Sequence, residues 1–174
     1  REYQDHKTNI DNAIHTVLDH GIFINGPEVK ELEAKLKYIA DGTNIICGTE
    51  EDPIVTDSKQ IPIEHFFMDG VYVRKMTMFK DTVVIGAIHK HLHMCFLLQG
   101  HLSVVSESGT KEYIAPCYII AEPGEKRVLY SHEDSCWYNT HKNPNNTQDV
   151  RELEEQIVAL SYEEYNEYIN NKNK

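Results

Sequence analysis

Three histidines, His89, His91 and His93, alternate with other residues near the middle of the chain. In an extended strand, alternate side chains leave the same face, so we expect all three to face one side of a sheet. Imidazoles that converge on a pocket can bind zinc, iron, nickel or manganese and leave positions open for water or a ligand. Same-face neighbours on a strand lie about 6.5 Å apart. Two ligands from this strand and one from elsewhere therefore fit one ion more easily than all three.

The third ligand is expected from the last strand-like segment, where His141 shares its parity with Trp137 and Asn139. The predicted metal ligands are therefore His89, His93 and His141. The predicted cofactor is a divalent transition metal, and the residues do not distinguish Zn, Fe, Mn and Ni. The alternative is that one or two of these histidines only form hydrogen bonds in a polar pocket.

Histidine also supports chemistry without a metal, because a pKa near about 6.5 lets it exchange protons at neutral pH. His91 and Tyr130 are the candidate catalytic residues for that role. Arg127, on the expected inward side of its strand, is a candidate to bind a carboxylate or phosphate of a ligand, and Trp137 is assigned to the same ligand. The alternative for Arg127 is a salt bridge to a local acid such as Glu122.

Short β-rich segments separated by turn residues fill the chain between residues 61 and 141. Many short strands with no helix between them are typical of a β-sandwich or jelly roll. The expected strands are Val71–Phe79, Thr82–Ala87, His89–Leu98, Leu102–Ser106, Lys111–Ile114, Tyr118–Ala121, Arg127–Tyr130 and Ser135–His141.

Apolar residues at helical spacing flank this β region on both sides. They predict helices within residues 8–40 and one helix over residues 148–168. We expect these helical segments to pack on the barrel or on a second copy of the chain, which makes a homodimer the predicted assembly. The expected units are an N-terminal helical arm (1–47), a linker (48–60), a β-barrel (61–143) and a C-terminal helix with its tail (144–174).

The amino-acid composition limits the classes of molecule that this protein is expected to bind. The 174 residues include 17 Lys+Arg and 28 Asp+Glu, which gives a formal net charge of −11. This acidic balance argues against nucleic acid or an anionic membrane as a partner. The four cysteines form no C-x-x-C pair, and no apolar stretch is long enough to span a bilayer. The N-terminus shows no signal-peptide pattern, so a cytoplasmic protein with reduced thiols is expected.

The β region resembles the cupin superfamily. The first cupin motif is similar to Gly86-Ala-Ile-His89-Lys-His91-Leu-His93-Met-Cys-Phe-Leu-Leu-Gln-Gly100, and the second is similar to Glu122-Pro123-Gly124-Glu125-Lys126-Arg127. Counted back from Gly100, His89 stands at the family's second His and His93 at its Glu. Ala87 stands at the first His and Arg127 at the second-motif His, so the standard four-ligand set is not retained. The resemblance implies a mainly β, cupin-type jelly-roll barrel with a ligand pocket.

A second resemblance covers residues 13–33, which are similar to the opening of DegT/DnrJ-type sugar aminotransferases, with Gly48-Thr49 at the place of that family's Gly-Thr loop. The chain leaves no room for the large domain that would hold pyridoxal phosphate, so neither that cofactor nor transamination is expected. The leading hypothesis is a small cupin that binds or transforms a small anionic or sugar-derived ligand, with a metal in its barrel. The alternatives are a metal-free nucleotide-sugar isomerase or epimerase, and a non-catalytic binding or structural module.

Overall fold

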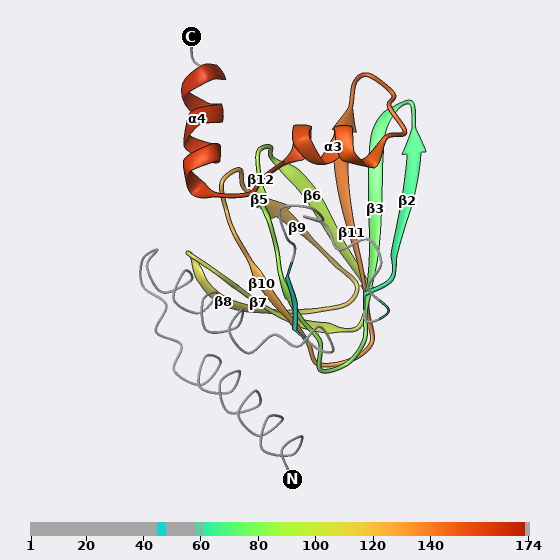
Figure 1. Ribbon diagram of the computed structural model, residues 1–174. Coiled ribbons are helices and arrows are strands. Elements are labelled where there is room, and N and C mark those ends of the chain that lie inside the picture. Colours follow the sequence, from blue (N-terminus) through green and yellow to red (C-terminus); the bar gives the residue numbers. More distant parts are fainter. Residues whose placement is uncertain (1–44, 48–58, 60, 173–174) are drawn as a thin grey trace.

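Two five-stranded β-sheets face each other in the computed structural model, which describes residues 45–47, 59 and 61–172 (Figure 1). Sheet A has the strand order β1-β4-β10-β7-β8, and sheet B has the order β2-β3-β11-β6-β9. The expected mainly β jelly roll with flanking helix is confirmed. The strands are β1 (Ile45–Cys47), β2 (Ile63–Met68), β3 (Gly70–Met78), β4 (Val83–Ile85), β5 (Ile88–His89), β6 (His93–Gln99), β7 (His101–Ser106), β8 (Gly109–Ile114), β9 (Cys117–Ala121), β10 (Val128–Ser131), β11 (Ser135–Asn143) and β12 (Val158–Ala159).

The N-terminal predictions fall largely outside the described residues. These are the helices within residues 8–40, the aminotransferase-like segment and nearly all of the linker. Within the described part, β1 and β2 were not among the expected strands, and β1 lies inside the segment predicted as a helical arm.

The apolar core lies between the two sheets. Leu102 and Val104 of sheet A meet Leu97, Met78 and Trp137 of sheet B, and all five are buried. Alternation along each strand explains this arrangement, because every second residue turns inward. The inner face of sheet B is polar further along the same strands, and there the candidate site lies.

The expected strand His89–Leu98 is interrupted, so the prediction of three histidines on one face is wrong. His89 ends β5, His93 begins β6, and residues 90–92 lie in neither strand. The backbone N–H of Lys90 donates to the carbonyl oxygen of Ile157 at 2.7 Å. This contact fixes the chain between the two strands in a bent conformation, which separates the direction of the His91 side chain from those of its neighbours.

The C-terminal region also differs from the single helix expected over residues 148–168. It forms α3 (Val150–Ile157) and α4 (Tyr162–Lys172), separated by β12. Asp149 caps α3, because its side chain accepts from the backbone N–H of Arg151 at 2.9 Å. The helix stops at Val158, which pairs with His89 in an antiparallel two-stranded sheet.

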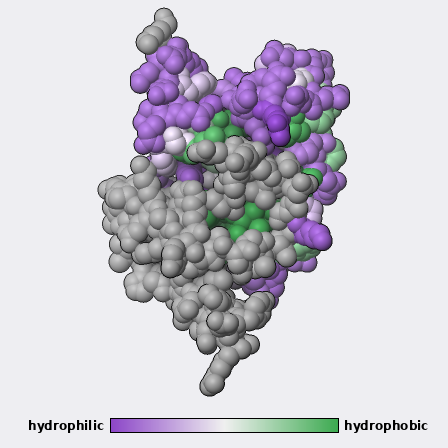
Figure 2. Space-filling model, viewed as in Figure 1, coloured by the Kyte–Doolittle hydropathy of each residue, from purple (hydrophilic) through white to green (hydrophobic). Residues whose placement is uncertain are grey.

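The two C-terminal helices cover one end of the sandwich (Figure 1). Leu153 and Ile157 of α3 pack against Tyr72 of β3, while α4 buries none of its residues. The outer surface of both helices is hydrophilic (Figure 2). Within the described residues, no helix combines the length and apolar character needed to cross a bilayer.

Candidate metal centre

Three of the predicted residues, His89, His93 and His141, lie together inside the sandwich. They come from β5, β6 and β11, and each offers one ligand atom within 4.8 Å of the others'. Their ring centroids are 4.3 Å apart for His89 and His93, 4.6 Å for His93 and His141, and 5.4 Å for His89 and His141. The break after His89 and the pairing of β6 with β11 bring about this convergence.

One nitrogen of each ring is buried without a hydrogen-bond partner in the part of the chain that the structure describes. The Nε2 atoms of His89, His93 and His141 are buried, and none has a hydrogen-bond partner among the described residues. A buried polar atom without a partner costs about 1–3 kcal/mol. Three such atoms in one cluster of neighbouring rings therefore form a costly arrangement unless something binds them. A donor set of three imidazoles suits borderline divalent ions such as zinc, iron or nickel.

The electrostatic environment keeps the three imidazoles neutral, which is the form that binds a metal. Burial lowers the pKa of His93 to about 4, and it lowers the pKa values of His89 and His141 well below the usual range. His93 has a defined tautomer, because its Nδ1–H donates to the carbonyl oxygen of His91 at 3.1 Å. That hydrogen bond leaves the lone pair on Nε2 and orients the ring, as is usual for metal-binding histidines.

Arg74 is the site residue that the sequence analysis missed. It lies on the inward face of β3 beside Asn139 of β11, and its Nε is buried without a hydrogen-bond partner among the described residues. Its charge contributes to the lowered pKa values of His89 and His141, after the larger effects of burial and of the neighbouring histidine. The signal was present in the parity that Arg74 shares with Tyr72, but without the fold nothing showed which parity faces inward.

Two further groups surround Arg74. The carboxylate of Glu154, a buried residue of α3, acts on Arg74 by raising its pKa, although burial lowers that pKa more strongly. Tyr72 donates to or accepts from Nδ1 of His65 at 2.7 Å, and its ring lies 6.0 Å from that of His141. Burial raises the pKa of Tyr72 to about 12, so its hydroxyl stays protonated at neutral pH.

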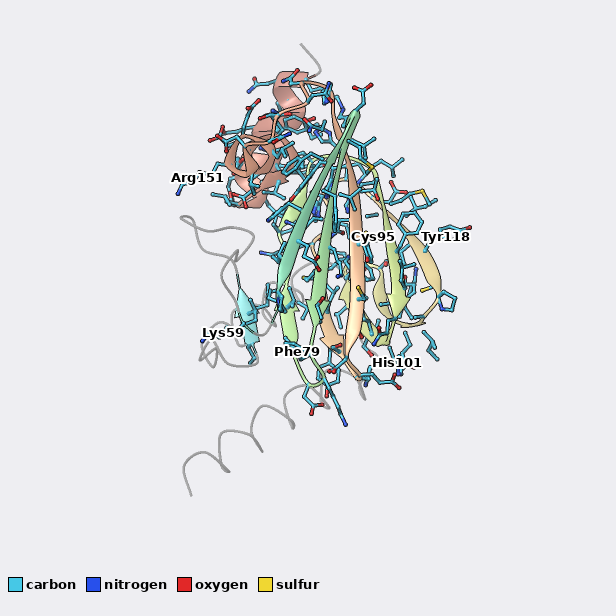
Figure 3. All side chains as sticks on the ribbon, turned by 90° about the vertical axis from the view of Figure 1, so that its right-hand side faces the viewer. Lys59, Phe79, Cys95, His101, Tyr118 and Arg151 are labelled. Atoms are coloured by element: carbon cyan, nitrogen blue, oxygen red, sulfur yellow. The ribbon has the colours of Figure 1, made fainter. Side chains whose placement is uncertain are left out.

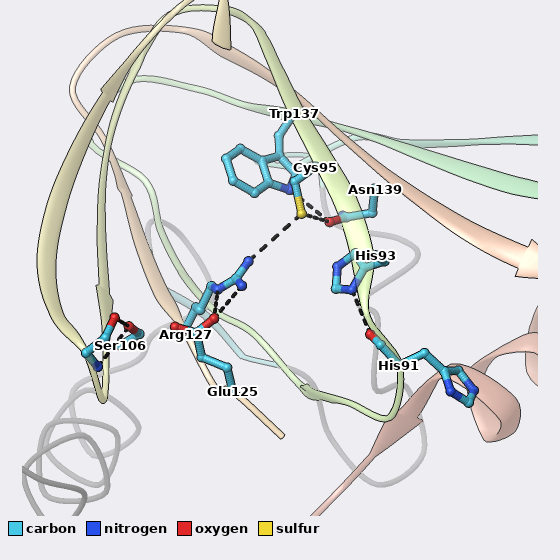
Figure 4. A network of polar contacts seen from close by, with 9 residues as sticks. His91, His93, Cys95, Ser106, Glu125, Arg127, Trp137 and Asn139 are labelled. Carbon is cyan, nitrogen blue, oxygen red and sulfur yellow. Dashed lines mark hydrogen bonds and ion pairs between the residues drawn. The ribbon is translucent and has the colours of Figure 1, made fainter. Parts of the chain in front are cut away.

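Arg127 lies across the interior from these groups and already holds a carboxylate. Its Nε donates to Oε2 of Glu125 at 2.9 Å, and one terminal nitrogen faces the Cys95 thiol at 3.9 Å (Figure 4). Arg127 therefore forms a salt bridge to a local acid, as the alternative prediction said, but the acid is Glu125 and not Glu122. Cys95 and Trp137 both donate to Oδ1 of Asn139, at 3.2 and 3.0 Å.

Two cavities meet at Arg127. An outer cavity of about 750 Å³ opens between the turn that ends β9, the β7–β8 turn and α4, and Tyr113, Tyr162 and Tyr165 line it. An inner cavity of about 70 Å³ reaches His89 and Arg74. Both cavities are lined by Arg127 and Trp137, the two residues predicted to bind a ligand. Their position agrees with that assignment, which remains a prediction.

The two predicted catalytic residues lie away from the three histidines. His91 points toward the C-terminal helices (Figure 4), with its Nε2 at 2.9 Å from the carbonyl oxygen of Gln156 and its Nδ1 at 3.3 Å from the Tyr168 hydroxyl. Tyr130 donates to Asp81 at 3.0 Å and lines neither cavity. Neither side chain therefore belongs to the histidine cluster. A catalytic role for either residue stays a prediction.

A second group of possible ligands lies on sheet A. His101, Glu112 and His132 have ligand atoms within 4.8 Å of one another, and the two imidazole rings stack at 4.2 Å. This group differs from the first, because Glu112 is exposed and faces His101 at 3.4 Å, and Nε2 of His132 contacts the Ser103 hydroxyl at 2.7 Å. Nε2 of His101 is also buried without a hydrogen-bond partner among the described residues, but the Glu112 carboxylate lies within ion-pair distance of it.

No family model and no curated protein matches the sequence. Solved structures resemble the fold at low sequence identity. They include a Cupin 2 conserved barrel domain protein from Salinispora arenicola, with a TM-score of 0.43 and 11% identity over 49% of this chain and 78% of that chain. The Clostridium difficile EutQ protein gives 0.42 and 11% over 49% and 69%, and ectoine synthase from P. lautus gives 0.44 and 14% over 51% and 67%. The likeness is one of fold alone.

Proposed function

We propose that the protein is a small cupin that binds a divalent transition metal through His89, His93 and His141 and receives a small anionic ligand beside Arg74. The proposal rests on three histidines that offer ligand atoms within 4.8 Å of one another, each with a buried Nε2 that lacks a partner among the described residues. A divalent ion would satisfy all three at once, because neutral imidazole is among the commonest ligands of such ions. When bound, the ion supplies a Lewis acid that polarises an oxygen of the ligand or of water.

The expected charge of the ligand follows from the surrounding side chains. Three neutral histidines add no negative charge to balance a divalent ion, and Arg74 adds a further positive charge. Glu154 is the acid that acts on Arg74, and Glu125 is engaged by Arg127. The inner cavity therefore favours an anion, which Arg74 can bind through its guanidinium. The cavity volume of about 70 Å³ limits the group that enters it to the size of a carboxylate or a similar oxyanion.

The outer cavity provides room for the rest of a larger ligand. Its three tyrosines and the Trp137 ring offer flat apolar surfaces with polar edges. Such surfaces suit a sugar-derived or aromatic body whose anionic end reaches past Arg127. The ligand class that we propose is therefore a small organic anion, either whole within the inner cavity or as the end of a larger molecule.

The metal is tested by titrating metal-depleted protein with Zn²⁺ or Co²⁺ in the His101→Ala/His132→Ala background, which removes the second group of possible ligands. His93→Ala should weaken binding by about 100-fold or more, because it removes a ligand from the metal. His91→Ala is the matched control two residues away, and its affinity should stay within about twofold. Equal metal affinity in these two variants, or no binding to the parent, would show that the assignment is wrong.

The anion is tested with oxalate on the zinc-loaded protein. Arg74→Met keeps much of the side-chain length but removes the charge, and we expect it to weaken oxalate binding by about tenfold or more. Lys142→Met is the control, since it removes a positive charge from an exposed residue of β11 that lines neither cavity. If Arg74→Met leaves oxalate binding unchanged, Arg74 does not select the ligand.

The metal-free alternative is favoured by one observation, the contact between His65 and Tyr72 beside His141. A hydrogen-bonded imidazole and phenol can exchange a proton with a ligand without any metal. Turnover of nucleotide sugars by metal-depleted protein, lost in Tyr72→Phe, would support the isomerase alternative. Ligand binding without turnover in either state would support the non-catalytic module.

A further inference from the structure

The outer face of sheet B is apolar and exposed. It consists of the side chains that turn away from the core, on even-numbered residues of β2, β6, β9 and β11 and on odd-numbered residues of β3. Figure 3 shows these strands side by side, with Tyr118 at the β9 edge. Six large hydrophobic side chains on this face are between 40% and 65% exposed, namely Phe66, Met68, Met94, Leu98, Tyr118 and Ile120.

These side chains lie in two apolar groups on the sheet, one at each edge, with Thr140 of β11 between Val73 and Met94. Strand pairing places Met94 opposite Ile120, and Phe96 opposite both Tyr118 and Tyr138. At the other edge, Phe66 lies opposite Val73. Side chains on directly opposed residues lie about 4.5–5.5 Å apart at Cβ and contact each other. The exposed hydrophobic residues are therefore clustered. Single exposed hydrophobic residues are normal on a protein surface, but a cluster of them needs an explanation.

The same face carries almost no net charge. Its charged residues within the described strands are Glu64, Lys75 and Lys142, and the first two form an ion pair with each other. The chain as a whole has a formal net charge of −11. Two copies with that charge repel each other, so they can approach most easily through a face with little net charge. A partner recognised by charge complementarity would find few unpaired groups here.

The size of the face approaches that of a dimer interface. Five strands at about 4.8 Å spacing, each contributing about 20 Å of length, span roughly 500 Å² in projection. Side chains that project from this plane add accessible area, and a standard interface buries about 800 Å² per partner. A monomer rarely exposes a continuous apolar patch of more than a few hundred Å².

We propose that the outer face of sheet B binds the same face of a second copy, forming a two-fold symmetric dimer. A flat sheet face can pack against a like face at about 10 Å, as the two sheets of a sandwich do. Two-fold symmetry needs only one self-complementary surface. An anionic membrane is disfavoured as the partner, because the face has no cluster of Lys and Arg to attract lipid head groups.

The test is sedimentation velocity of the full chain over a range of concentrations. The parent protein should be a dimer at about 10 µM. Met94→Glu/Leu98→Glu places charges in the face and should weaken the dimer by about 100-fold or more, because like charges would meet across the two-fold axis. Near-UV circular dichroism and thermal unfolding of the variant show whether it keeps its fold, as expected for two exposed positions.

Ile114→Glu is the matched control, since Ile114 is even more exposed at 68% but lies on β8 of sheet A. It should leave the dimer unchanged. A parent protein that stays monomeric at about 100 µM would overturn the proposal. A dimer that survives Met94→Glu/Leu98→Glu, or one that Ile114→Glu disrupts equally, would place the interface elsewhere. Neither result depends on whether the histidines bind a metal.

Discussion

The two faces of sheet B reverse the usual pattern of a β-sandwich over part of their area. In most sandwiches, inward residues are apolar and outward residues are polar. Here β6 turns His93 and Cys95 inward and Met94 and Leu98 outward. The inner face ends in histidines and an arginine, whereas the outer face is mostly apolar and carries little net charge. Hydrophobicity alone therefore does not identify the buried side of this sheet.

The reversal has a different explanation on each face. A polar inner face is stable only where each buried group has a partner, and three histidines and Arg74 each have a buried nitrogen without one among the described residues. An exposed apolar face of this extent usually marks a surface that another molecule covers. Local violations of the hydrophobic pattern concentrate at functional sites. We infer that the inner face requires a ligand and the outer face a second copy.

The largest difference in the free energy of unfolding is expected between substitutions at two adjacent residues of β6. Leu97 is fully buried in the core, and Leu97→Ala should destabilise the protein by about 4 kcal/mol through the cavity that it leaves. Leu98→Ala should cost less than about 0.5 kcal/mol in dilute protein, because this side chain is exposed in the monomer. Urea unfolding measures both values. Equal costs at low concentration would contradict the described orientation of the strand.

A slightly smaller effect is expected from Glu154, the buried acid that acts on Arg74. Glu154→Gln removes the negative charge that acts on the buried guanidinium and should cost about 3 kcal/mol in the free energy of unfolding. Glu155→Gln changes an exposed residue of the same helix and should stay within about 0.5 kcal/mol. If both variants unfold alike, the charge on the inner face is compensated in another way.

The metal-free protein should lose stability in mild acid because of the inner face. The pKa of His93 is about 4 in the folded chain and near 6.5 when unfolded, so the unfolded state takes up the proton first. The contribution of neutral His93 is therefore present above pH 6.5 and is lost as the pH falls through about 4. We expect it to account for about 2 kcal/mol between pH 7 and pH 4.5.

Urea unfolding at a series of pH values, for the parent and for His93→Gln, measures this contribution. The variant should show a shallower loss of stability below pH 6.5 than the parent does, because it cannot take up that proton. Parallel curves for the two proteins would mean that His93 is not held neutral by its surroundings.

The smallest effect is expected at Tyr130, which lies outside both cavities. Tyr130→Phe removes the hydrogen bond to the exposed Asp81 and should cost about 0.5 kcal/mol. Zinc and oxalate affinities should not change. A loss of ligand binding or of turnover in this variant would restore Tyr130 as a catalytic candidate and would show that the site extends beyond the sandwich interior.

The sequence predicted much of the barrel and part of the site. Alternation and turn residues located eight of the strand regions, and parity linked His141 to the histidine-rich segment. The position of the break between β5 and β6 could not be predicted, because it depends on Lys90 bonding to Ile157 far along the chain. The same long-range contact explains why the single C-terminal helix was wrong. Val158 is β-branched and so suits a strand, but it forms one only because it pairs with His89.

Arg74 escaped prediction for a related reason. A charged residue within a strand normally indicates the solvent side, and the apolar residues Val71 and Val73 of β3 suggest that the core lies on their side. The structure places them on the outer face. Periodicity alone distinguishes two faces of a strand but does not say which one is inside, and a sheet with an apolar outer surface removes the usual clue.

The short pairing between β5 and β12 also affects the order in which the site can assemble during synthesis. The histidine-rich segment leaves the ribosome well before its C-terminal anchor, since 65 residues separate His91 from Gln156, whose carbonyl it contacts. His89 can pair with Val158 only after β12 has been made. Until then, a nascent chain would have most of its barrel strands but not the contacts to residues 156–158 that hold residues 89–91. The last short strand therefore controls when, as well as where, His89 is held.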